Sequence, residues 1–203
     1  TFSRNESPHR LPLQLAEVVH EALRLVKVTL PPHVSLQVNI DETTPPVLAN
    51  ATQIEQAILN LCTNAIHSLT QQPAILQVEL GYSLRASDDT TERRSGLRGH
   101  HVKLTVSDTG SGMSESTLQR IFEPFFTTKP VGHGTGLGLS VVHGIMRAHM
   151  GSVRVKSTPG QGSEFRLYFP VSDDDIEPVS VLPTEPYPAM GAGQRVMYVD
   201  DDE

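Results

Sequence analysis

The N-terminal third of the chain carries hydrophobic patterns of two different periods. Over Leu13–Leu30 the apolar residues recur at every third or fourth position, which predicts an amphipathic helix, and a Pro-Pro pair ends it. Over Val34–Ile40 apolar and polar residues alternate, as in a half-buried strand. A second helical stripe follows and continues to about Leu69, and Asn50 can cap its first turn together with Gln53 three residues later.

The rest of the chain predicts further strands and helices up to Pro170. In order these are strands at Ile75–Leu84 and His101–Val106, a short helix at Ser114–Ile121, a helix ending near His149, and strands at Ser152–Lys156 and Glu164–Phe169. The resulting order, α, β, α, β, β, α, α, β, β, is typical of an α/β fold in which helices cover one face of a mixed sheet.

Composition favours one folded body followed by an acidic tail. The chain has 203 residues, 37% of them hydrophobic, which is enough for one sizeable core, and we place it at residues 13–170. Residues 1–12 are expected to end an earlier helix and turn the chain. Residues 171–203 hold nine acids against the single Arg195, and 171–194 are also rich in Pro, so this stretch is predicted to be a linker. The remaining body is almost neutral, which argues against nucleic acid as a partner.

Two further counts exclude whole classes of protein. A single cysteine, Cys62, cannot form an internal disulfide, and no apolar run approaches the roughly 20 residues of a membrane span. We therefore expect no membrane insertion of this segment and a cytoplasmic location, with a membrane anchor elsewhere in the parent protein left open.

A cluster of glycines precedes the helix that ends near His149. Gly132, Gly134, Gly136 and Gly138 stand at two-residue intervals, where backbone N–H groups can approach an anion beside a helix N-terminus. The spacing matches neither the dinucleotide fingerprint nor the P-loop. Taken alone, the cluster indicates either a phosphate site or a flexible hinge.

Two other patterns place polar groups beside apolar elements. Asp108 directly follows a predicted strand and is followed by two glycines, so its carboxylate could accept a hydrogen bond from an exocyclic amine, although a plain turn has the same pattern. Asn60 and Asn64 stand four residues apart and share one face of the second helix. They could be buried hydrogen-bonding struts or could offer a neutral oxygen to Mg²⁺.

These pieces belong to five short motifs that occur in a fixed order along the chain. They are Asn60-Leu-Cys-Thr-Asn64-Ala65, Asp108-Thr-Gly-Ser-Gly112, Phe122-Glu-Pro-Phe-Phe-Thr-Thr-Lys129, Gly134-Thr-Gly-Leu-Gly-Leu139 and Gly160-Gln-Gly-Ser-Glu-Phe165. In this order they resemble the N, G1, F, G2 and G3 boxes of the catalytic domain of sensor histidine kinases. The resemblance covers roughly Leu13 to Pro170. It implies the Bergerat fold shared with gyrase, the ninety-kilodalton heat-shock ATPases and mismatch-repair ATPases, a two-layer α/β sandwich with a mobile ATP lid.

The resemblance implies ATP and Mg²⁺ as ligands and assigns roles to individual residues. Asp108 would bind the adenine amino group, while Gly110 and Gly112 would line the base pocket. Asn64 would hold Mg²⁺ against the phosphates, and Asn60 would support it.

The F and G2 motifs would together form the lid segment over the phosphates. Lys129 would place its charge on the terminal phosphates, and the N–H groups around Gly136–Leu139 would cradle them. The residues implied to bind the nucleotide from these motifs and from the G3 box are Phe122, Thr128, Lys129, Gly134, Thr135, Gly136, Leu137, Gly138, Leu139 and Ser163.

One substitution favours a kinase over a hydrolase. In the hydrolytic relatives a Glu four residues before the Mg²⁺-binding Asn activates water, and this chain has Asn60 there. An amide cannot take a proton from water, so fast ATP hydrolysis is not expected. Glu55 lies on the same helix but five residues before Asn60, and we assign it no such role.

The chain also departs from the commonest family pattern. His67 and Ser68 stand where many members have a basic and then an aromatic residue, which leaves the usual phosphate or base contacts at these positions open. The pattern is closer to the nitrogen-regulation type of kinase.

The resemblance implies an enzyme whose phosphate acceptor lies elsewhere. We expect the catalytic domain of a two-component sensor histidine kinase, transferring the γ-phosphate of ATP to a histidine on an upstream dimerisation domain, whose last helix would end at Thr1–Arg4. His20-Glu21 superficially resembles an acceptor pair but lies inside the first helix of the catalytic domain, where an ordinary helix histidine is the better interpretation. We expect the fragment to be a monomer and the parent a homodimer. The alternatives are a hydrolytic ATPase of the superfamily and a degenerate nucleotide-sensing module.

The last residues of the chain suggest a further domain. Residues 195–203 include Val196-Met-Tyr-Val-Asp200-Asp-Asp-Glu203, which resembles the first strand and acidic pair of a response-regulator receiver domain. This implies a hybrid kinase, with a downstream receiver domain or a separate response regulator as its partner.

Overall fold

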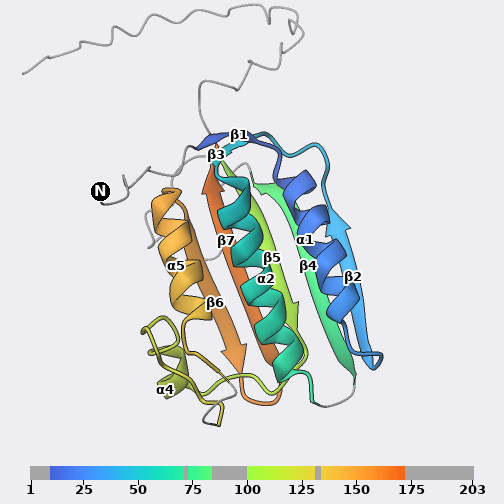
Figure 1. The fold of residues 1–203 in the computed structure, drawn as a ribbon, viewed down its shortest axis with the longest axis vertical. Coiled ribbons are helices and arrows are strands. Elements are labelled where there is room, and N and C mark those ends of the chain that lie inside the picture. The colour runs from blue at the N-terminus through green and yellow to red at the C-terminus, as the bar shows by residue number, and fades with distance from the viewer. Residues whose placement is uncertain (1–9, 71–72, 84–99, 131–133, 172–203) are drawn as a thin grey trace, which may run out of the picture.

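A computed structural model describes residues 10–70, 73–83, 100–130 and 134–171, and it places three long helices over one sheet (Figure 1). In chain order the elements are β1 (Leu11–Leu13), α1 (Leu15–Thr29), β2 (Val34–Ile40), β3 (Val47–Ala49), α2 (Ala51–Ser68), β4 (Ala74–Ser83), β5 (His101–Asp108), α4 (Glu115–Leu118), α5 (Gly138–Ala148), β6 (Ser152–Thr158) and β7 (Gly162–Pro170). The helices and strands predicted from periodicity are all present, with ends shifted by a few residues.

The main sheet is mixed. Its five strands lie in the order β2-β4-β5-β7-β6, with β2 parallel to β4 and every other pair antiparallel. Helix α2 lies between β2 and β4 in the chain, and a crossover helix of this kind is what a parallel pair requires. Helices α1, α2 and α5 all lie on the same face of the sheet, which confirms the predicted two-layer α/β arrangement (Figure 1).

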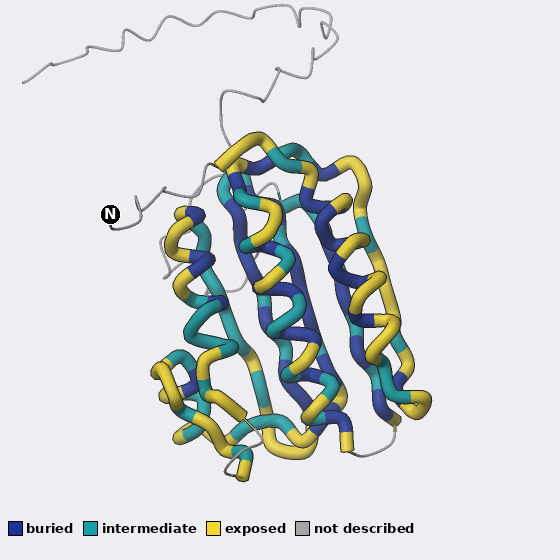
Figure 2. Tube along the Cα trace, in the orientation of Figure 1, coloured by how far each residue is buried: buried dark blue, intermediate teal, exposed yellow. Residues whose placement is uncertain are grey.

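The core lies between these two layers. In β4 every second residue, Ala74, Leu76, Val78 and Leu80, is buried, as period-two alternation requires when one face of a sheet is covered. The stripe on α2 is buried against it, and each large aliphatic side chain removed from water contributes about 1.5–3 kcal/mol. Figure 2 shows buried residues along α2 and the central strands, and exposed positions concentrated on helix surfaces and on edge strand β2. The α2 residues in this core are Ile54, Ala57, Ile58, Leu61, Cys62 and Ala65.

A second, two-stranded sheet was not predicted. Strand β1 pairs antiparallel with β3, with Leu13 opposite Val47, so the first helix begins at Leu15 and not at Leu13. Both strands have only three residues, too few to display a period, and Leu11 is 65% exposed. Of the predicted turn at residues 1–12, positions 1–9 lie outside the described residues.

The predicted cap of the second helix is formed on one side only. The Asn50 side chain accepts a hydrogen bond from the Gln53 backbone N–H at 3.1 Å, as expected. The Asn50 backbone N–H, which Gln53 would satisfy in a complete capping box, instead donates to Nε2 of His149 at 3.0 Å. Nδ1 of the buried His149 ring lies 2.7 Å from the carbonyl oxygen of Ile145, to which it donates. One histidine at the end of α5 thus joins that helix to the start of α2.

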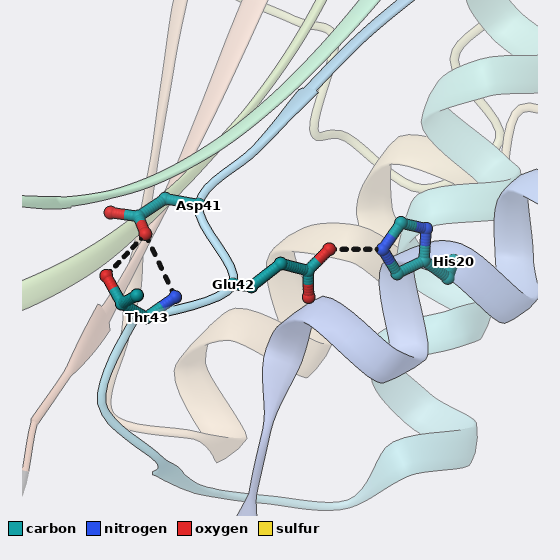
Figure 3. Close-up of polar contacts among 4 residues, drawn as sticks. All are labelled: His20, Asp41, Glu42 and Thr43. Atoms are coloured by element: carbon teal, nitrogen blue, oxygen red, sulfur yellow. Dashed lines mark hydrogen bonds and ion pairs between the residues drawn. The ribbon is translucent and has the colours of Figure 1, made fainter.

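Polar contacts tie α1 to the turn after β2 (Figure 3). His20 Nε2 lies 2.6 Å from Glu42 Oε1, and both side chains are about half exposed or more. Asp41 Oδ1 accepts from the N–H and the hydroxyl of Thr43 at 2.9 and 2.6 Å, and these bonds lower the pKa of Asp41. The carboxylate beside His20 is therefore Glu42, and the adjacent Glu21 pairs with Arg24 instead.

The described chain ends beside the small sheet. Val171 is buried and forms an isolated bridge with Val47. The predicted linker and receiver-like segment lie outside the described residues from position 172 onward. None of the helices in the described part of the chain combines the length and the apolar character needed to cross a membrane.

Candidate functional site

A cavity of about 550 Å³ opens where the last turn of α2, the end of β5, helix α4 and the first turn of α5 meet. Figure 1 shows these elements together in the lower half of the view. Most of the residues predicted from the motifs line this cavity. They are Asn60, Asn64, Asp108, Gly112, Thr128, Lys129, Gly134, Thr135, Gly136, Gly138, Leu139 and Ser163.

Three predicted residues do not line the cavity. Gly110 donates its N–H to the Asp108 carboxylate at 2.8 Å. Leu137 is the N-cap residue of α5 and is 37% exposed. The Phe122 ring packs against His143, with ring centroids 5.1 Å apart, and borders a separate cavity of about 210 Å³ beside β6.

Asp108 is a buried carboxylate held by neutral donors. It is the last residue of β5 and is 9% exposed. Its Oδ1 accepts from the Ser68 hydroxyl and from the Gly110 N–H, each at 2.8 Å. Burial raises the pKa of Asp108, while hydrogen bonds from Ser68, Gly110 and Ser163 oppose the rise. The Asp108 carboxylate can therefore accept a further hydrogen bond from a donor group on a ligand.

Ser68 is a part of this site that no prediction assigned. Its role depends on the contact between the end of α2 and the loop after β5, where the Ser111 N–H also donates to the Ser68 carbonyl at 3.1 Å. The only signal in the sequence was its small size at a position that is often aromatic. A Cβ on Gly110 would lie 2.2 Å from Ser68 Oγ, so glycine is required for this close approach.

Glycines also bring the wall beside Asp108 into place. Gly112 has φ +63°, and a Cβ there would lie 2.0 Å from the Thr158 carbonyl oxygen. Gly162 has φ +86°, and its Cβ would lie 1.8 Å from the Asp108 carbonyl oxygen. Both positions combine a left-handed backbone with direct backbone contact, which only glycine tolerates. The β6–β7 turn is thereby fixed against the end of β5.

The second end of the cavity is built from two amides and a helix N-terminus. Asn60 and Asn64 share the face of α2 that points to the first turn of α5. A Cβ on Gly138 would lie 3.6 Å from Asn64 Nδ2 and 3.7 Å from Asn60 Oδ1. The free N–H groups in the first turn of the 11-residue α5 therefore lie next to the side-chain amides of Asn60 and Asn64. This is a favourable place for an anion.

The residues present suit a divalent cation only together with an anionic ligand. Amide oxygens are hard donors of the kind Mg²⁺ accepts. Among the described residues Asp108 is the only acid that lines the cavity, and its carboxylate is bound by Ser68 and Gly110. Across the described residues no group of three or more His, Cys, Asp or Glu is arranged to hold a metal ion. A cation bound near Asn64 would thus take most of its ligands from phosphate oxygens and water.

The F and G2 parts of the lid segment contact each other, and Lys129 contacts α2. The Phe125 N–H donates to the Gly136 carbonyl at 2.9 Å, and both residues have positive φ. A Cβ on Gly136 would lie 2.3 Å from the Phe125 carbonyl carbon, so the backbone at Phe125 and the backbone at Gly136 are in direct contact. At its outer end Lys129 Nζ lies 2.8 Å from His67 Nδ1 on α2.

Comparisons with known proteins agree with this geometry. Residues 49–173 match the family described as "Histidine kinase-, DNA gyrase B-, and HSP90-like ATPase". The sensor histidine kinase ZraS of Escherichia coli (strain K12) is 35% identical over 169 residues, which are 81% of this chain and 32% of that protein. The sensor kinase CckA of Brucella abortus (strain 2308) is 33% identical over 171 residues, 83% of this chain and 18% of that protein. The chain thus spans about a third or less of the length of these relatives.

Solved structures share the fold. The catalytic domain of histidine kinase ThkA matches with a TM-score of 0.63 at 24% identity, over 79% of this chain and 95% of that one. The mycobacterial sensor histidine kinase MprB matches with a TM-score of 0.62 at 23% identity, over 79% and 97%.

Fold, cavity and family match together define a nucleotide-binding domain of the ATPase class. The chain belongs to the histidine kinase-, DNA gyrase B- and HSP90-like ATPase family. The two relatives named above are sensor histidine kinases, and this chain corresponds to the ATP-binding catalytic domain of such kinases.

Proposed function

We propose that this domain binds MgATP in the 550 Å³ cavity and transfers the γ-phosphate to a histidine on a dimerisation domain of the parent protein. The observation that carries the proposal is the pairing, within one cavity, of a buried carboxylate at one end with two amides and a helix N-terminus at the other. The first suits a purine amino group and the second suits phosphates.

At the base end, Asp108 accepts a hydrogen bond from the adenine amino group. Its carboxylate is oriented by Ser68 and Gly110 before the nucleotide arrives, so little ordering remains to be done on binding. Gly112 leaves the wall beside the base open. Met113 and Ile121 supply apolar surface for the ring within the same cavity.

At the phosphate end, backbone N–H groups of Gly136–Leu139 and the positive end of α5 stabilise negative charge. Among the described residues that line the cavity, Lys129 adds the only Lys or Arg charge, and Thr128 adds a hydroxyl. Asn64 would hold Mg²⁺, with Asn60 in support, and a bound Mg²⁺ neutralises and aligns the phosphates. Phosphoryl transfer needs mainly such positioning and charge stabilisation.

Transfer to a protein acceptor is favoured over hydrolysis by what lines the cavity. Asn60 is an amide and cannot act as a base toward water. In the described part of the chain Asp108 is the only carboxylate that lines the cavity, and hydrogen bonds from Ser68 and Gly110 hold it at the base end. Glu55, on the same helix, does not line the cavity.

For the parent protein we propose a homodimer that receives its phosphate on an upstream dimerisation domain and passes it to a receiver domain. Because residues 195–203 resemble the start of a receiver domain, the receiver would follow in the same chain, which would make the parent a hybrid kinase. Otherwise the receiver would belong to a separate response regulator. The cytoplasm is the compartment that supplies ATP for this reaction.

Autophosphorylation of the full-length parent tests this proposal. With γ-labelled ATP and Mg²⁺ we expect a phosphoprotein, and we expect Asn64→Ala to abolish it while Gln56→Ala, on the exposed face of α2, leaves it intact. Rapid phosphate release with no phosphoprotein would instead favour the hydrolytic alternative. Nucleotide binding with neither product would favour a sensing module.

A further inference from the structure

We propose that His67 is a positioning residue for Lys129, holding the lysine ammonium at the phosphate end of the cavity through a hydrogen bond to its ring. This inference rests on the proposed function, because it concerns how the same cavity receives the phosphates of ATP. His67 would act through Lys129 and not on the nucleotide itself.

The contact joins two segments far apart in the chain. Lys129 Nζ lies 2.8 Å from His67 Nδ1, the two residues are 62 positions apart in sequence, and both line the cavity. An ammonium has only donors, so Nδ1 must accept and the ring must be neutral with its proton on Nε2. His67 comes three residues after Asn64 on α2. The His67 ring therefore holds the Lys129 ammonium close to the turn of α2 that carries Asn64.

The stem of the lysine is also confined. A Cβ on Gly134 would lie 3.1 Å from Cδ of Lys129 and 3.4 Å from its Cβ, which shows that the stem packs along the Gly134 backbone. The Lys129 N–H donates to Thr127 Oγ1 at 3.1 Å. Only the head of the side chain remains to be oriented, and His67 supplies that contact. A long flexible side chain loses much rotamer freedom when it is ordered, and here part of that loss precedes ligand binding.

Next to the Lys129 ammonium, the neutral His67 ring is more favourable than a second positive charge would be. Burial and the charge of Lys129 lower the pKa of His67, which keeps the ring in its accepting form. Burial also lowers the pKa of Lys129. In the part of the chain that the structure describes, no carboxylate forms an ion pair with the Lys129 ammonium, and His67 is its partner. Because an ammonium has three donors, Lys129 can keep its bond to His67 and still donate to phosphate oxygens.

A double-mutant cycle on nucleotide affinity tests the inference. The affinity of the chain for a non-hydrolysable ATP analogue with Mg²⁺ would be measured by calorimetry for the native protein, His67→Ala, Lys129→Ala and the double variant. We expect His67→Ala to weaken binding by roughly three- to tenfold, the range that ordering one long side chain represents. With Lys129 already replaced, the same change should have no effect.

Two companion measurements separate positioning from a general structural role. For AMP, which lacks the terminal phosphates, His67→Ala should leave the affinity unchanged. His67→Gln keeps an acceptor and should recover part of the lost ATP-analogue affinity. Gln56→Ala, an exposed change on the same helix and outside the cavity, is the matched control and should bind like the native protein.

The inference is overturned if His67→Ala leaves the affinity unchanged, or weakens it equally with and without Lys129. In either case the proposed function would still hold if the native protein binds the analogue and Lys129→Ala weakens that binding. A native protein that binds no analogue would overturn the proposed function and this inference with it.

Discussion

Asp108 shows at the scale of one residue how binding and stability oppose each other in this domain. Its carboxylate is 9% exposed, and three neutral donors only partly replace the water it loses. Because burial raises its pKa, the folded state holds the proton more tightly than the unfolded chain does. The stability it contributes is therefore present below the ordinary pKa and is lost as pH rises through the raised value.

The variant Asp108→Asn should consequently remain folded and be at least as stable as the native protein at pH 7. Asparagine keeps an oxygen that can accept from Ser68 and Gly110 but carries no buried charge. Denaturant unfolding at several pH values would check this. The advantage of the variant should grow as pH rises from below 3.8 through the raised pKa of Asp108. If the stability of Asp108→Asn falls relative to that of the native protein over this pH range, the raised pKa of Asp108 is contradicted.

Cys62 offers a second test at this scale. It is fully buried in α2, and burial raises its pKa to about 12. Since the thiolate is the reactive form, modification by a disulfide reagent at pH 8 should be slower in the folded protein by about a thousandfold or more. Denaturant should restore the rate. Fast labelling of the native state would mean that α2 is not packed as described.

At the scale of elements, the wall beside Asp108 depends on turns that only glycine can form. Gly162 and Gly112 combine positive φ with backbone contact, whereas Gly160 has φ +75° with open space around it. Gly144, inside α5, has neither constraint. Comparing substitutions at these glycines therefore separates the cost of steric contact from the cost of backbone strain.

Alanine at these positions should rank in a definite order. Gly162→Ala should cost about 2–5 kcal/mol of unfolding free energy, because strain and contact add, and Gly160→Ala only about 1–2 kcal/mol. Gly144→Ala should stabilise the protein by up to about 1 kcal/mol, since alanine favours a helix. Chemical denaturation measures all three. Equal costs at 162 and 160 would show that the backbone contact with Asp108 is not tight.

Sequence patterns predicted the elements well where they are long. The helix at Leu15–Thr29 follows from period alone, because it buries one face, and the strand at Val34–Ile40 also follows its alternation, although Val34 is its only buried residue. Strands β1 and β3 could not be predicted, because three residues display no period and their pairing depends on how the ends of the chain meet. The bond from Asn50 to His149 spans 99 residues, and no local pattern indicates it.

At the scale of the whole molecule, four separate stretches of sequence meet around one cavity. The ordered motifs predicted most of its lining, including Asp108 and Asn64, because each motif has a local chemistry that the spacing displays. Ser68 and the partnership of His67 with Lys129 were not predicted. Both arise where the end of α2 packs against loops distant in sequence, so that only the folded arrangement contains them. Phe122 was predicted at the nucleotide but packs on His143 instead of lining the cavity.

The most direct test of the account is calorimetric titration with a non-hydrolysable ATP analogue and Mg²⁺, run on this chain and on Asp108→Asn. We predict binding by the native protein and a loss of at least about a hundredfold in the folded variant, as expected when a charged acceptor is lost in a buried site. Equal affinities in the two proteins, or no binding by the native chain, would contradict the assignment of Asp108 and of the cavity.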